Sequence, residues 1–65
     1  MKAYRMCGKF KGARKNSQYD HPAKDDEEAL SWATDHCTRH PMFMPARLVE
    51  VIAVGEYRTL PFGLA

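Results

Sequence analysis

The chain has 65 residues, which leaves room for one domain, residues 1–65, and one small hydrophobic core. A hydrophobic share of 45% and a charged share of 28% are those of a globular protein, so disorder of the whole chain is excluded. The net charge is only +2, but residues 1–19 contain six of the ten lysine and arginine residues and no acid. The molecule is therefore expected to be electrically polarised.

Targeting and redox signals are weak. The longest uncharged run is far shorter than the ~20 apolar residues of a membrane span. The N-terminus has basic residues but no apolar segment behind them, so we expect no signal peptide and a cytoplasmic protein in a bacterial host. In that compartment Cys7 and Cys37 are expected to be reduced, buried thiols.

Residues 2–10 alternate as a first strand. One face carries Tyr4, Met6 and Phe10, and the other carries Ala3, Arg5, Cys7 and Lys9. Gly8 predicts a bulge. A polar connection over residues 11–17 leads to a short second strand over residues 17–21, and Pro22 is expected to end it because proline cannot donate to a ladder.

Residues 25–40 predict the helix. Asp25 or Asp26 can cap its first turn, where the acids at 25–28 also favour the positive end of the helix dipole. Its apolar stripe consists of Ala29, Leu30, Ala33 and Cys37, with Trp32 at the edge. Pro41 stops the winding. The acidic run has an alternative interpretation as a phosphate mimic or a cation site, but a capped helical turn is favoured.

Residues 46–58, ARLVEVIAVGEYR, predict the central strand of the sheet. Its two apolar faces require cover on both sides, and one helix covers only one. The tail, with Leu60, Phe62 and Leu64, is one candidate for the second cover, and a partner protein is the other. A fourth short strand near residues 56–60 is also possible. The fold class is α+β: a two-layer ββαβ domain with an antiparallel sheet packed on one helix.

Two patterns permit site chemistry but favour structural roles. His36 and His40 share a helix face, and Cys7, His21 or Cys37 are further candidate metal ligands. A Cys37–His40 nucleophile pair is the enzymatic interpretation of the same residues. The cysteine spacing of zinc sites and an oxyanion donor are both missing, so we expect no enzyme, no metal, no cofactor and no catalytic residue.

The basic segment is the strongest candidate site. It comprises Arg5, Lys9, Lys11, Arg14 and Lys15, with the aromatic residues Tyr4, Phe10 and Tyr19 close in sequence. These cations can follow a phosphate backbone, with the aromatics stacking on bases, or they can dock on an acidic protein surface. Met42 and Met44 are expected to be adaptable partner contacts, while Phe43 between them plugs the core.

The order MKAY strand, polar hairpin, acid-started helix (DDEEALSWA) and β-branched strand (ARLVEVIAV) covers most of the chain. It resembles small inhibitors made by bacteriophages and mobile elements, namely anti-CRISPR proteins of the ββαβ type and podophage inhibitors of host RNA polymerase. The resemblance implies a non-enzymatic, monomeric inhibitor that occludes a bacterial protein or ribonucleoprotein complex handling nucleic acid. A nucleic-acid-binding module and a metal- or thiol-dependent protein remain the alternatives.

Overall fold

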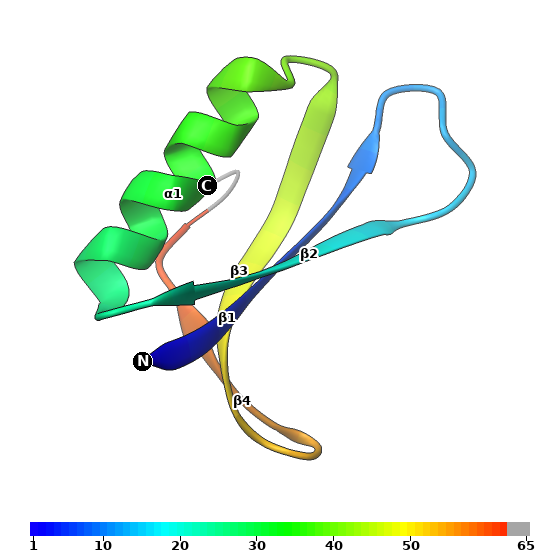
Figure 1. The fold of residues 1–65 in the computed structure, drawn as a ribbon. Helices are drawn as coiled ribbons and strands as arrows, with labels where there is room; N and C mark the ends of the chain where they lie inside the picture. The colour runs from blue at the N-terminus through cyan, green and yellow to red at the C-terminus, as the bar shows by residue number, and fades with distance from the viewer. Residues whose placement is uncertain (63–65) are drawn as a thin grey trace.

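The computed structural model describes residues 1–62, which form a four-stranded antiparallel sheet with one helix across it (Figure 1). In chain order the elements are β1 (Lys2–Phe10), β2 (Ser17–Ala23), α1 (Asp26–Arg39), β3 (Phe43–Ala53) and β4 (Glu56–Leu60). The strand order across the sheet is β2-β1-β3-β4. The α+β fold of ββαβ type is confirmed, and the fourth short strand predicted near residues 56–60 is present as the edge strand β4.

Strand β1 has the faces that its alternation predicts. Tyr4 and Met6 are fully buried against the helix side, and Phe10 packs on the same core. Cys7 and Lys9 point to the opposite face and stay half-buried. The expected irregularity is present, because the β1–β3 register shifts between Cys7 and Gly8.

Strand β2 is longer than predicted, because it continues through Pro22 to Ala23. Pro22 pairs with Ala3 of β1, so the expectation that proline ends the strand is wrong. The physical reason is the position of β2 at an edge of the sheet. A proline whose nitrogen faces the unpaired side of an edge strand removes no ladder hydrogen bond.

The helix begins and ends where the sequence predicts. Asp25 is the N-cap, and its carboxylate accepts a hydrogen bond from the Glu28 backbone N–H at 2.9 Å. At the other end the His40 N–H donates to the His36 carbonyl at 3.0 Å, and Pro41 follows. Ala29 and Ala33 are buried against the sheet, which confirms the predicted apolar stripe.

The single strand predicted over residues 46–58 is wrong. The chain instead forms a hairpin, in which β3 ends at Ala53 and β4 starts at Glu56. Gly55 has a φ of 79°, a left-handed conformation that glycine adopts without the steric cost of a side chain. The side chain of Val54 beside it is fully exposed, so the apolar run in the sequence continues past the buried part of the strand. The β3–β4 register also shifts between Val51 and Ala53.

The core lies on the helix side of the sheet. Its largest fully buried side chains are Tyr4, Met6, Leu48 and Leu60. Leu60 belongs to this cluster and Phe62 packs against it, so the expectation that the tail covers the second face of the sheet is wrong for these two residues. Leu64 lies outside the described residues. The other sheet face, which we call the open face, is covered by no helix of residues 1–62 (Figure 1).

The helix start is tied to the sheet by a polar cluster. The Tyr4 hydroxyl donates to the Asp26 carboxylate at 2.8 Å, and Arg58 donates to the same oxygen at 2.6 Å and to Glu50 at 2.7 Å. Burial, with the hydrogen bond to Asp26, raises the pKa of Tyr4 to about 12. The hydrogen bonds from Arg58 and Tyr4 lower the pKa of Asp26. Acidic residues near this end are therefore engaged within the fold.

Candidate binding site

The predicted cations gather at the end of the sheet where β1 turns into β2. Lys9 is near the end of β1, while Lys11, Arg14 and Lys15 lie exposed in the connecting loop. The Lys11 N–H donates to the Met42 carbonyl at 2.8 Å, so the loop is anchored beside the start of β3. The N-terminal end of α1, with its acidic first turn, lies away from this loop (Figure 1). The predicted polarity of charge is therefore present in the fold.

Arg5 occupies a different environment from the other predicted cations. Its guanidinium forms an ion pair with Asp20 across the β1–β2 ladder, at 2.8 Å, and lies 5.9 Å from the centroid of the Tyr57 ring. The hydrogen bond from Arg5 lowers the pKa of Asp20. Arg5 thus belongs to a cross-strand cluster in the middle of the open face rather than to the loop end.

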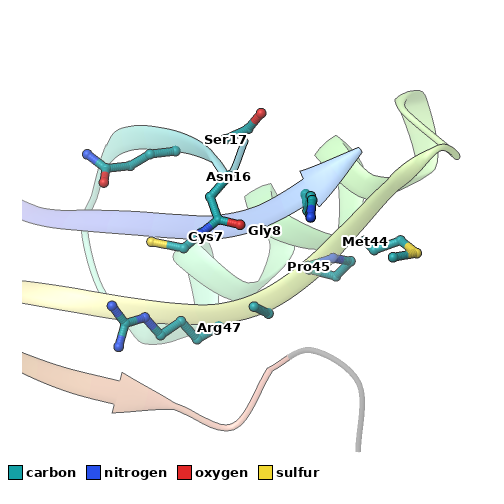
Figure 2. A pocket seen from close by; sticks show the side chains of 10 residues that line it. Cys7, Gly8, Asn16, Ser17, Met44, Pro45 and Arg47 are labelled. Atoms are coloured by element: carbon teal, nitrogen blue, oxygen red, sulfur yellow. The ribbon is translucent and has the colours of Figure 1, made fainter. Parts of the chain in front are cut away.

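A pocket of about 640 Å³ opens on this face beside the basic loop (Figure 2). We call it the basic groove. Its lining comes from three neighbouring strands and the loop: Cys7, Gly8 and Lys9; Asn16, Ser17 and Gln18; and Met44, Pro45, Ala46 and Arg47. No carboxylate is among these described lining residues. The groove therefore combines two cations with hydroxyl and amide donors and an apolar wall.

The groove lies at the bulge in the β1–β3 ladder. Cys7 pairs with Arg47, whereas Gly8 pairs with Pro45, so Ala46 is the extra residue. A Cβ built on Gly8 would lie 2.4 Å from the Met44 carbonyl oxygen and 2.6 Å from Phe43 Cζ. Only glycine allows this close approach of the strands. Pro45 is tolerated within a central strand because it lies at the bulge.

Arg47 was not predicted as part of the site. In Figure 2 its side chain lies beside Cys7, on the facing strand. The alternation of residues 47–49 does place Arg47 and Val49 on one face and Leu48 on the other. Which of these two faces stays uncovered depends on the strand register and on the position of the helix, and the alternation of three residues predicts neither.

Met42 and Met44, which the sequence predicts as partner contacts, lie beside the basic segment: Met42 accepts from the Lys11 N–H and Met44 pairs with Lys9. Met42 is 53% exposed and Met44 is 49% exposed, and Met44 also lines the basic groove. Phe43 between them is buried and packs edge-on against Phe10, with ring centroids 5.3 Å apart. The prediction that Phe43 plugs the core while a methionine stays exposed is confirmed.

The aromatic residues that were expected to accompany the cations face the other way. Tyr4 is fully buried, and Phe10 and Tyr19 pack against the core on the helix side. Tyr19 lies against His36, with ring centroids 4.4 Å apart. The hypothesis that these three rings stack on bases beside the basic loop is therefore wrong, because the open face and the helix face are opposite sides of one sheet.

The proposed metal or thiol residues do not converge. Cys7 lines the groove on the open face, whereas Cys37 packs against the core on the helix side. Burial raises the pKa of Cys37, which disfavours the thiolate that a nucleophile requires. The rings of His36 and His40 lie in tilted contact, with centroids 4.6 Å apart. Residues 1–62 contain no group of three or more His, Cys, Asp or Glu side chains placed to hold a metal.

Among residues 1–62 no helix has the length and apolar character that crossing a bilayer requires.

Comparison with known proteins leaves the site to be interpreted on its own chemistry: no family model, curated protein or solved structure matches the chain.

Proposed function

We propose that this chain is a non-enzymatic binding protein that docks its basic end onto an acidic surface of a bacterial nucleic-acid-handling complex and occludes it. The observation that carries the proposal is the clustering of cations at one end of the sheet, of which all but the half-buried Lys9 are exposed. We call this set the basic end: Lys9, Lys11, Arg14, Lys15 and Arg47. Such a cluster speeds association with an acidic partner and fixes its orientation.

A protein partner is favoured over direct binding of nucleic acid. Single-stranded nucleic acid is usually held by cations together with exposed aromatic rings. Beside the basic end, however, Phe10 and Tyr19 face the core, and the exposed apolar side chains are Met42 and Met44. Flexible thioethers adapt to a protein surface, and methionine is enriched in protein interfaces.

The class of partner comes from the resemblance to phage and mobile-element inhibitors, which act in the host cytoplasm. Surfaces that bind nucleic acid attract phosphates with lysine and arginine side chains, so the basic end requires an acidic patch elsewhere on the same complex. A protein of this size can cover about 800 Å² of one such surface, which suffices for a specific interface. Inhibition would follow from occupation of the surface, without any chemical step.

The experiment is capture from a nuclease-treated bacterial lysate with the tagged protein, followed by identification of the bound proteins. The test variant is the charge reversal Lys11→Glu with Arg14→Glu. The matched control is Lys2→Glu with Lys24→Glu, which changes the net charge equally at exposed positions near the opposite end of the sheet. We expect a nucleic-acid-handling complex to be retained by the wild type and the control and lost by the test variant.

Two results would contradict the proposal. One is equal capture by the test and control variants, which would make the basic end irrelevant. The other is a purified protein that captures no complex but retards DNA or RNA in a gel, with affinity that falls steeply and linearly on a log–log salt plot. That second result would identify a nucleic-acid-binding module instead.

A further inference from the structure

The two cations of the basic groove have a defined spacing. Cys7 pairs with Arg47, and Lys9 pairs with Met44 beyond the bulge, so Lys9 and Arg47 are diagonal neighbours on the open face. Diagonal cross-strand positions are about 7–8 Å apart, within reach of long side chains. Asn16, Ser17 and Gln18 border the groove on the β2 side and add hydrogen-bond donors.

We propose that the basic groove binds an extended acidic peptide segment of the partner, with two glutamates spaced as Glu-x-Glu. This inference rests on the proposed function and adds the chemistry of the partner's contact. One carboxylate pairs with Lys9 and the other with Arg47 on the facing strand. The residue between them points away from the groove.

The spacing of an extended chain fits this pair of cations. A strand rises about 3.3 Å per residue, and alternate side chains share one face, so glutamates at positions i and i+2 lie about 7 Å apart. That distance matches the separation expected of the two diagonal strand positions that carry Lys9 and Arg47. Adjacent glutamates would instead point to opposite faces, and only one of them would reach the groove.

The apolar wall favours glutamate over phosphate. Met44, Pro45 and Ala46 line the side of the groove formed by β3, and Figure 2 shows Met44 and Pro45 along that strand. A glutamate side chain has two methylene groups that contact such a wall while its carboxylate reaches a cation. A phosphate group has no apolar part and leaves this wall solvated.

The test uses fluorescein-labelled short peptides of identical composition, measured by fluorescence anisotropy at low salt. One carries Glu-Ser-Glu at its centre and the other carries Glu-Glu-Ser. Because one additional exposed ion pair forms with the first peptide, we expect it to bind about threefold to fivefold more tightly. Arg47→Gln and Lys9→Gln should each remove this preference.

The matched control is Arg39→Gln, which removes a cation that is exposed on α1 and paired with Asp35. It should retain the spacing preference, and circular dichroism should show all three variants folded. Equal affinity of the two peptides for the wild type would overturn the inference. So would a preference that survives both groove substitutions, or a single-stranded oligothymidylate that binds more tightly than Glu-Ser-Glu through the same two residues.

The two proposals fail separately. If lysate capture depends on Lys11 and Arg14 while the peptides bind equally, the docking function stands and the groove inference is wrong. If the peptides show the Arg47-dependent preference but no complex is captured, the groove takes acidic peptides and the proposed occlusion of a nucleic-acid-handling complex is wrong.

Discussion

Gly8→Ala should destabilise the protein, although the same change in an unobstructed strand is mildly stabilising. Replacing glycine with alanine in a compatible conformation usually adds about 0.4–1 kcal/mol by restricting the unfolded chain. At this position the new Cβ would lie 2.4 Å from the Met44 carbonyl oxygen, 2.6 Å from Phe43 Cζ and 2.9 Å from Pro45 Cα. Two of those atoms are backbone, so a side-chain rotation cannot relieve the clash.

The cost of forcing additional atoms into a packed region is about 1–3 kcal/mol. The net loss in the free energy of unfolding is therefore about 1–2 kcal/mol, out of about 3–5 kcal/mol for a domain of this size. Each kcal/mol shifts the melting temperature of such a domain by about 4–8 °C. We expect thermal denaturation followed by circular dichroism to show a melting temperature lowered by about 5–15 °C.

The control is Cys7→Ala, a truncation at the adjacent position, where the side chain points to the open face. It should change the free energy of unfolding by less than about 1 kcal/mol. A melting temperature of Gly8→Ala equal to or above that of the wild type would refute the close packing of β1 and β3.

Three further predictions concern buried and titrating groups. Val49 is 2% exposed, so Val49→Asp should lower the free energy of unfolding by more than about 3 kcal/mol and unfold the domain. Val51 is half-buried, so the control Val51→Asp should leave a cooperative urea transition. A wild-type-like transition for the first variant would contradict the burial. The hydrogen bond from Arg58, followed by that from Tyr4, is the largest cause that lowers the pKa of Asp26. The Asp26 carboxylate therefore binds a proton less tightly in the folded state than in the unfolded state. The stability that this group contributes is complete above its ordinary pKa of 3.8 and is lost as pH falls toward the lower folded value. Asp26→Asn should flatten that acid dependence of the melting temperature, and an unchanged slope would be evidence against the cluster. Burial is the main cause that lowers the pKa of His36 below its ordinary value of 6.5. The unfolded state therefore binds a proton at His36 more tightly than the folded state does. The free energy of unfolding should fall as the pH drops from 6.5 toward the lower pKa of the folded state. Proton NMR titration should give a midpoint below 6.5, and a midpoint at or above it would show that the ring is well solvated.

The sequence predicted those elements whose boundaries are determined by local chemistry. Strand β1 was recovered from its alternation, and the helix from the Asp25 cap and the stop at Pro41. A fourth strand near residues 56–60 was predicted, but the turn between β3 and β4 was not placed, because Val54 extends an apolar run. Its side chain is fully exposed, and only the left-handed φ of Gly55 marks the turn. At such residues the tertiary context, rather than the intrinsic strand propensity, determines the secondary structure.

The candidate site was predicted in its charges but not in its geometry. Lys9 and the loop cations follow from a segment without acids, and the structure adds Arg47 through strand register. The hypothesis that Phe10 and Tyr19 accompany the cations was wrong for a simple reason. An aromatic residue next to lysines in sequence lies on the opposite face of a strand whenever their positions differ by an odd number.

Pairing of β1 with β3 has a kinetic consequence. The β1–β2 and β3–β4 hairpins connect neighbours in sequence, but Met6 pairs with Leu48 across the intervening helix. Closing that long loop costs entropy before its contacts stabilise the fold, so we expect pairing of β1 with β3 to limit the folding rate. Refolding after rapid dilution from urea should accordingly slow when Leu48 is truncated, whereas truncation of Thr59 on β4 should act mainly by accelerating unfolding.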